Sequence, residues 1–181
     1  MRTKKKSLTP PYGYLVRVLR PFPSFDFSFI KSVRQKAVDL LSLKPGDRVL
    51  DMGCGPGGSF PYLVQAVSPS GQVVGVEISP DISVNARRRI ARNEWKNVEV
   101  IEADARKVDL TAAFDGLLMF AAADVYASKQ ALEHIFPHLR DNARVVAFGA
   151  KLSSSQLGKM FESIITDAVQ SLFLNNSQTR L

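Results

Sequence analysis

The stretch that decides the fold is Val49-Leu50-Asp51-Met52-Gly53-Cys54-Gly55-Pro56-Gly57-Gly58. An apolar run ends there in an acid, a glycine-rich turn follows, and residues 60–67 have the apolar pattern of a helix. A strand, a glycine turn and a helix in this order are how an α/β sheet presents backbone N–H groups to a nucleotide-like ligand. The glycines read G-x-G-x-G and not the G-x-G-x-x-G of dinucleotide sites. An NAD site and a turn without a ligand remain as alternatives.

Composition indicates one globular domain. The chain has 181 residues, 45% of them hydrophobic and 23% charged, which suits a single soluble domain. Its one cysteine, Cys54, excludes an intrachain disulfide and fits a reducing cytoplasm. The prolines and arginines of the basic start interrupt any signal peptide, and no apolar stretch is long enough to cross a membrane. We therefore expect a cytoplasmic protein.

The positive charge lies ahead of the glycine turn. The formal net charge is +7, and residues 1–50 hold 11 Lys/Arg against three Asp/Glu. Residues 1–27 also carry four prolines and five aromatic residues, so we expect a basic, aromatic arm or cap there. Its aromatic residues either pin it to the core by apolar burial or form a lid over the acceptor pocket. Its positive charge either attracts RNA, an anionic membrane or an acidic substrate, or belongs to a solvated terminus.

Short apolar segments alternate with helical segments through the rest of the chain. We predict strands at 47–52, 72–78, 98–102, 114–120 and 143–148, and helices at 28–42, 60–67, 80–93, 128–139 and 155–173. This alternation favours a parallel sheet covered by helices on both faces. Residues 28–181 would form this domain.

The pattern D-x-G-x-G-x-G at residues 51–57 resembles motif I of the class I S-adenosylmethionine (SAM)-dependent methyltransferases. The resemblance implies a Rossmann-like three-layer sandwich, SAM as the cofactor and S-adenosylhomocysteine as the product. It also implies that Asp51 accepts from the ammonium of SAM. The small or rigid residues Gly53, Cys54, Gly55, Pro56 and Gly57 would then let the backbone approach the ligand.

The resemblance assigns further residues at the ends of the later strands. Glu77 would hold the ribose hydroxyls, with Ile78 against the adenine. Asp104 would accept from the adenine amino group and Ala105 would make the adjacent backbone contact. Phe120 would flank the sulfonium. Asp124 and Tyr126 are catalytic candidates by position alone. Packing or surface roles are the alternative for both.

Two features limit the resemblance. The family sheet has seven strands, but after Phe148 the chain holds one expected helix and a polar end, so the last two strands are absent from the expected sheet. The fifth strand would then be an open edge, which favours pairing into a homodimer. His134 and His138 share a helix face without a third ligand, so we expect no metal site.

The sequence therefore predicts a SAM-dependent methyltransferase that acts by in-line displacement on a small or lipid-like acceptor, in the cytoplasm or peripherally at a membrane. An RNA methyltransferase is the first alternative, suggested by the basic arm. The segment after the fourth strand is not the N-P-P-Y type of base-amino methyltransferases, which disfavours nucleic acid. A SAM-binding protein without catalysis is the second alternative.

Overall fold

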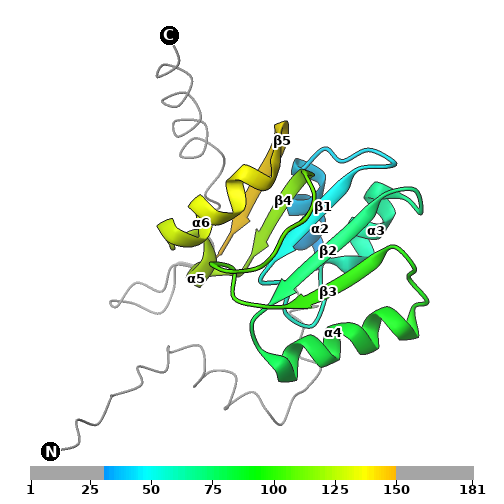
Figure 1. The fold of residues 1–181 in the computed structure, drawn as a ribbon. Helices are drawn as coiled ribbons and strands as arrows, with labels where there is room; N and C mark the ends of the chain where they lie inside the picture. Colours follow the sequence, from blue (N-terminus) through cyan, green and yellow to red (C-terminus); the bar gives the residue numbers. More distant parts are fainter. Residues whose placement is uncertain (1–30, 150–181) are drawn as a thin grey trace, which may run out of the picture.

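A computed structural model describes residues 31–149, and these form a five-stranded parallel sheet with helices on both faces (Figure 1). The strands are β1 (Arg48–Met52), β2 (Gln72–Glu77), β3 (Val98–Glu102), β4 (Phe114–Phe120) and β5 (Leu139–Phe148). The helices are α2 (Lys31–Leu40), α3 (Phe60–Val67), α4 (Pro80–Arg92), α5 (Ala123–Tyr126) and α6 (Lys129–Ile135), followed by the 3₁₀ turn η2 (Phe136–His138). The predicted Rossmann-like sandwich is confirmed.

The order of the strands places the ligand crevice. The sheet order is β3-β2-β1-β4-β5, so the chain runs outward from β1 in one direction and returns to start again at β4. Ligands of open α/β sheets bind beyond the carboxyl ends of the strands, at the point where the direction reverses. In this chain that point lies between β1 and β4, where the glycine turn follows β1.

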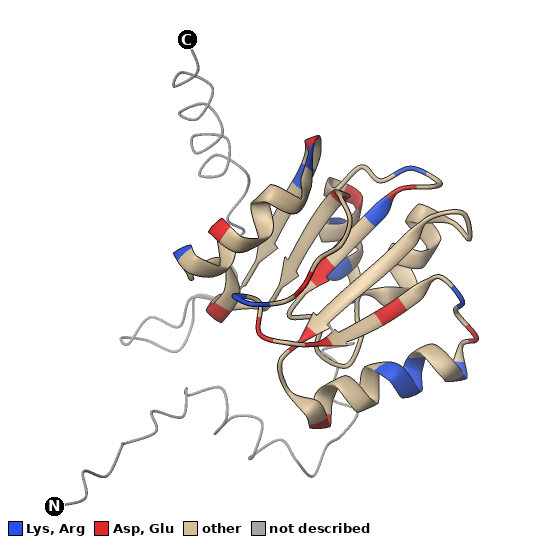
Figure 2. Cartoon of the chain, viewed as in Figure 1, with Lys and Arg blue, Asp and Glu red and all other residues tan. Residues whose placement is uncertain are grey.

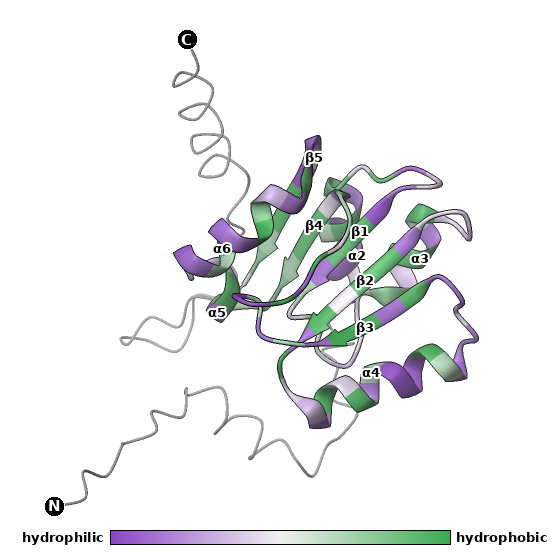
Figure 3. Ribbon diagram, in the orientation of Figure 1, coloured by the Kyte–Doolittle hydropathy of each residue, from purple (hydrophilic) through white to green (hydrophobic). Residues whose placement is uncertain are grey.

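Side-chain alternation along the central strands builds two hydrophobic layers. Val49 lies in the layer that includes residues of α2 and α3, whereas Leu50 lies in the layer that includes residues of α5 and α6. Both side chains are fully buried, and burial of a side chain of this size contributes about 1.5–3 kcal/mol. Figure 3 shows the central strands as mostly hydrophobic and α4 as largely hydrophilic.

The predicted elements differ from the structure mainly near β5. This strand begins at Leu139 instead of residue 143, and its register against β4 jumps from the pair Phe114–Leu139 to the pair Gly116–Arg144. The helix predicted for 128–139 ends at Ile135, and the next turn, which contains Pro137, is 3₁₀. A proline cannot donate to the preceding turn, which explains the early end.

Two predicted features lie outside the described residues, namely the arm at 1–27 and the helix at 155–173. Within residues 31–149, no helix combines the length and the apolar character needed to span a lipid bilayer.

Candidate cofactor site

Backbone N–H groups of the glycine turn after β1 donate hydrogen bonds to other groups of the protein. The N–H groups of Gly53 and Cys54 both donate to the carbonyl of Val76, at 2.8 and 3.0 Å. The N–H of Gly55 donates to Oε2 of Glu77 at 3.1 Å. These three amides are therefore bound to β2 and do not face a ligand; the expected role of the rest of the turn stays a prediction. This pairing fixes the turn against the end of β2.

The glycines instead supply positive φ angles and space. A Cβ on Gly53 would meet the Ala122 side chain at 2.7 Å, and a Cβ on Gly57 would overlap the Phe60 ring at 2.5 Å. A Cβ on Gly55, whose φ is +57°, would meet no protein atom within 4 Å. Gly55 thus borders open space beside the turn, while the other two glycines allow close packing beneath it.

Cys54 and Pro56 complete the turn in different ways. Cys54 is buried at 7% exposure, and burial raises the pKa of its thiol well above the usual range, with the charges of Asp51 and Glu77 adding to the effect. The thiol is therefore protonated and acts as a small packing group. Pro56 is half-buried at the tip of the turn.

Two buried carboxylates lie at the carboxyl ends of β1 and β2. Asp51 is 1% exposed, and its Oδ2 is buried with no hydrogen-bond partner among the described residues. Burial raises the pKa of Asp51 to about 7; the charge of Arg34 lowers it and that of Glu77 raises it. Glu77 is 2% exposed, and burial also raises its pKa. Figure 2 shows acidic residues at the carboxyl ends of β2 and β3.

Glu77 keeps acceptor capacity despite its internal partners. Its Oε1 accepts from the N–H of Ser79 at 2.8 Å, its Oε2 accepts from Gly55, and the N–H of Ile78 also interacts with the carboxylate. A carboxylate has about four acceptor positions, so Glu77 can still accept from a ligand hydroxyl. Ser79 begins α4 as its N-cap residue but makes no side-chain capping bond.

The expected adenine side holds an arginine that the sequence analysis missed. Asp104 accepts from the backbone N–H of Arg106 at 2.9 Å and from its guanidinium through Nε and Nη2. This bonding lowers the pKa of Asp104 to about 2. Ile78 is 50% exposed and offers an apolar surface, and Ala105 is half-buried. The adenine roles of these residues stay predictions.

A second missed residue, Arg34 of α2, lies at the end of β4. Its guanidinium carbon is 4.7 Å from the ring centre of Phe120, and Phe120 stacks on Phe148 with ring centres 4.7 Å apart. Arg34 is only 6% exposed. Its spacing from Ala37 and Val38, both buried residues of α2, was the available signal, because residues three and four apart share a helix face.

The two catalytic candidates lie at α5, after β4. Asp124 is exposed, and its charge raises the pKa values of both Glu77 and Tyr126, so it faces the same region as they do. Tyr126 is half-buried, and burial is the larger cause of its raised pKa. The space that a Cβ on Gly149 would need is taken by the Tyr126 hydroxyl. Tyr126 is therefore a protonated donor beside the end of β5.

The histidine pair has a local role. His134 Nε2 lies 2.7 Å from the carbonyl oxygen of Val108, and the rings of His134 and His138 are 6.1 Å apart. No group of three metal-binding side chains occurs within residues 31–149.

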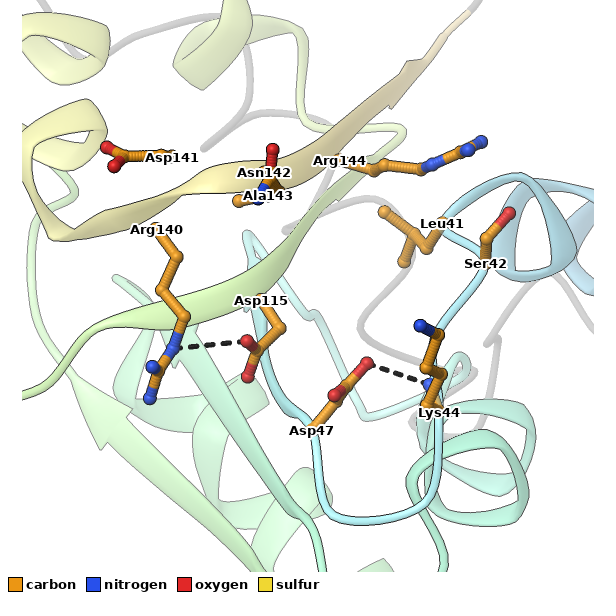
Figure 4. A pocket seen from close by; sticks show the side chains of 10 residues that line it. All are labelled: Leu41, Ser42, Lys44, Asp47, Asp115, Arg140, Asp141, Asn142, Ala143 and Arg144. Carbon is orange, nitrogen blue, oxygen red and sulfur yellow. Dashed lines mark hydrogen bonds and ion pairs between the residues drawn. The ribbon is translucent and has the colours of Figure 1, made fainter.

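A pocket of about 640 Å³ lies at the opposite edge of the sheet, where the strands begin (Figure 4). Two of its charges pair with each other, Arg140 with Asp115 at 3.1 Å, and Asp47 accepts from the backbone N–H of Lys44. The pocket is lined by Leu41, Ser42, Lys44, Asp47, Asp115, Arg140, Asp141, Asn142, Ala143 and Arg144. None of the predicted site residues lines it.

The fold, with its two buried carboxylates at the ends of β1 and β2, and the family match given below identify the class as that of the SAM-dependent methyltransferases. A SAM-dependent methyltransferase from Aquifex aeolicus superposes with a TM-score of 0.59 at 24% identity, covering 85% of this chain and 88% of that one. The family model of protein-L-isoaspartate(D-aspartate) O-methyltransferases matches residues 28–147. The chain belongs to this family.

Two curated relatives illustrate the similarity. The protein-L-isoaspartate O-methyltransferase of Pyrobaculum islandicum is 28% identical over 130 residues, which are 70% of this chain and 63% of the relative. The demethylmenaquinone methyltransferase of Symbiobacterium thermophilum is 31% identical over 111 residues, 59% of this chain and 44% of the relative. The chain thus spans less than two thirds of either relative.

The residues present fit SAM, the cofactor of this class. The unpartnered Oδ2 of Asp51 suits an ammonium group, and the remaining acceptor capacity of Glu77 suits a ribose hydroxyl. The open space at Gly55 leaves room for the ligand between them. The acidic character of Asp51, Glu77 and Asp124 also matches a ligand with a positive sulfonium.

Proposed function

We propose that this chain transfers the methyl group of SAM to a carboxylate of L-isoaspartyl residues in polypeptides, forming a methyl ester. The observation that carries the proposal is the family match, because residues 28–147 include β1 to β4 and all but the last residue of β5. It favours a protein acceptor over the small or lipid-like acceptor expected from the sequence.

The described residues suit an acceptor that needs no general base. SAM supplies a methyl group already attached to a good leaving group. A carboxylate is ionised at neutral pH, whereas a phenol or an amine must lose a proton. The raised pKa of Tyr126 keeps its hydroxyl protonated, so it can donate a hydrogen bond to an anion but cannot remove a proton at neutral pH. The chain's task is then to hold the two reactants in line and to exclude water.

The test uses methyl-labelled SAM and two peptides that differ only in one L-isoaspartyl or L-aspartyl residue. We expect label in the L-isoaspartyl peptide alone, in a form released by mild base, because a methyl ester is hydrolysed there and an N-methyl, C-methyl or ether group is not. A Glu77→Ala variant, which loses the ribose acceptor, is the control for background labelling.

Other outcomes would select the alternatives. Base-stable label in a quinone-type acceptor would support the second candidate, which the demethylmenaquinone methyltransferase relative favours. Label in RNA would support an RNA methyltransferase. Binding of S-adenosylhomocysteine without turnover on any of these acceptors would support a non-catalytic SAM-binding protein.

A further inference from the structure

The residue predicted to bind the adenine amino group is already bound by an arginine of the same chain. Oδ1 of Asp104 accepts from the backbone N–H of Arg106 at 2.9 Å and from its Nε at 2.8 Å. Oδ2 accepts from Nε at 3.1 Å and from Nη2. Each oxygen thus has two N–H contacts, and a carboxylate offers about four acceptor positions in all. A further donor can bind this carboxylate only by displacing the guanidinium.

The Asp104–Arg106 ion pair lies at the cofactor crevice. The N–H of Ala103 donates to the carbonyl of Glu77 at 3.1 Å, which places the end of β3 beside the end of β2. The side-chain bond to Asp104 raises the pKa of Arg106, and the charge of Asp124 on α5 adds to this effect. Asp124 also raises the pKa of Glu77, so these charged groups share one region.

The ion pair is exposed enough to exchange with a ligand. The side chain of Arg106 is 48% exposed and that of Asp104 is 23% exposed. An ion pair this accessible to water changes an equilibrium by only about two- to fivefold. Bonding to Arg106 lowers the pKa of Asp104 to about 2, so the carboxyl is ionised at neutral pH. It is therefore a full acceptor for a ligand as soon as the guanidinium leaves.

Arg106 and an amino group of a ligand are thus alternative donors for one acceptor. A base with an exocyclic amino group regains at Asp104 a hydrogen bond that the guanidinium gives up. A base with an oxygen at that position offers only an acceptor, which the carboxylate cannot bind. The apparent affinity of the amino-bearing ligand is reduced by the fraction of chains in which Asp104 is occupied by Arg106.

We propose that Arg106 is a specificity-determining residue of the cofactor site, which competes with the amino group of the adenine base for Asp104. The proposal rests on the proposed function, since it concerns the cofactor of the same reaction, and on the adenine role predicted for Asp104. A base without the amino group leaves the ion pair intact and gains nothing at this position. Removing the guanidinium therefore strengthens only the ligands that carry the amino group.

The test compares S-adenosylhomocysteine with S-inosylhomocysteine, in which an oxygen replaces the amino group of the base. The two ligands have the same net charge, so the loss of a positive charge from the chain affects both equally at long range. By calorimetric titration, Arg106→Met should strengthen S-adenosylhomocysteine about two- to fivefold and leave S-inosylhomocysteine unchanged. Arg106→Lys keeps the charge but loses the planar fork, so its gain should be smaller.

Arg87→Met is the matched control. Arg87 pairs with Glu102 at 3.4 Å, also at the end of β3, and its side chain is 45% exposed. This variant removes an arginine of similar exposure from a neighbouring carboxylate, and it should bind both ligands like the parent chain. A double-mutant cycle adds a second control: in an Asp104→Ala chain, Arg106→Met should no longer alter the affinity for S-adenosylhomocysteine.

The other outcomes contradict the competition. Weaker binding of S-adenosylhomocysteine to Arg106→Met would make Arg106 a ligand contact, and an unchanged affinity would mean that the ligand leaves the ion pair in place. An equal gain for both ligands, or a gain that persists in Asp104→Ala, would show that the amino group is not involved. Failure of the parent chain to bind S-adenosylhomocysteine would overturn the proposed function, whereas label in a different acceptor would overturn only the acceptor and leave this competition intact.

Discussion

Burial of the Asp51 carboxyl lowers the free energy of unfolding by an amount that depends on pH. Its pKa rises from 3.8 to about 7 on folding, so the folded state retains a proton that the unfolded state has lost. Stability from this group therefore falls as pH rises from about 4 to about 7 and stays low above that range. At alkaline pH the ionised side chain costs the fold on the order of 4 kcal/mol, from about 1.4 kcal/mol per unit of pKa.

Asp51→Asn should accordingly stabilise the protein. The gain should be larger at pH 8 than at pH 5 by about 2–3 kcal/mol, because the native carboxyl is protonated at pH 5 and charged at pH 8. Urea unfolding of both chains at the two pH values measures this, and affinity for S-adenosylhomocysteine should fall in the same variant. An equal gain at both pH values would mean that the buried carboxyl titrates near its ordinary range.

Glu77 is the second residue at which a substitution should weaken ligand binding while the chain still folds. Glu77→Gln keeps one acceptor oxygen for the turn but loses the charge, so it should weaken S-adenosylhomocysteine by about 1.5–3 kcal/mol. Glu102→Gln is the control, because Glu102 is its register partner on β3 yet bonds to Ser83 and Arg87 of α4. Calorimetry should find near-parent affinity for the control. Equal losses in the two variants would remove Glu77 from the ribose site.

At the scale of elements, two glycine variants can test whether the ligand lies against the glycine turn. Gly55 and Gly46 both have positive φ, and a Cβ on either meets no protein atom closer than 4.0 Å. Gly55→Ala and Gly46→Ala should therefore each cost about 1–2 kcal/mol of stability through the left-handed backbone alone. Only Gly55→Ala should also reduce affinity for S-adenosylhomocysteine, because Gly46 lies in the turn before β1. Parent-like affinity in Gly55→Ala would show that the ligand lies elsewhere.

The same turn shows what the sequence could and could not reveal. Local pattern placed Asp51 and Glu77 correctly at strand ends, because an acid after an apolar run and a glycine turn are both local signals. The acceptors of the N–H groups of Gly53 and Gly55 lie on β2, more than twenty residues further along the chain. The same limit explains Arg34: its partners belong to strands distant in sequence, so only the packing of α2 could bring them together.

The end of the sheet shows a further limit. The shift in register along β5 arises where Asp115 is the one residue between two pairs on β4 that are separated by 140–143 on β5. Nothing in the apolar run that ends at Phe148 indicates such a bulge, because the inserted residues 140–143 contain no glycine or proline and are mostly ordinary polar ones. Among the described strands β5 has β4 as its neighbour and stands at the edge. The homodimer through this edge stays a prediction.

For the whole molecule, truncation can test whether residues 1–27 serve the acceptor while the domain binds the cofactor. The described site residues all follow residue 30, and the excess of basic residues lies in the first 50. Removing residues 1–27 should leave the affinity for S-adenosylhomocysteine close to that of the full chain and should abolish turnover of the acceptor. Parent-rate turnover by the shortened chain would contradict the acceptor role. Loss of cofactor affinity in a folded chain would assign the arm to the cofactor site.

The rate at which the buried thiol of Cys54 reacts can report how often the glycine turn opens. It is the sole cysteine of the chain, and its burial and raised pKa keep it unreactive while the turn is closed. A thiol reagent therefore modifies the native chain only during brief local openings, and the rate of modification counts them. The proposed binding of S-adenosylhomocysteine at the closed turn should slow the modification in proportion to its occupancy. The mobility of the site thus becomes measurable at a native residue, and a modification rate that the ligand does not change would place the opening outside the turn.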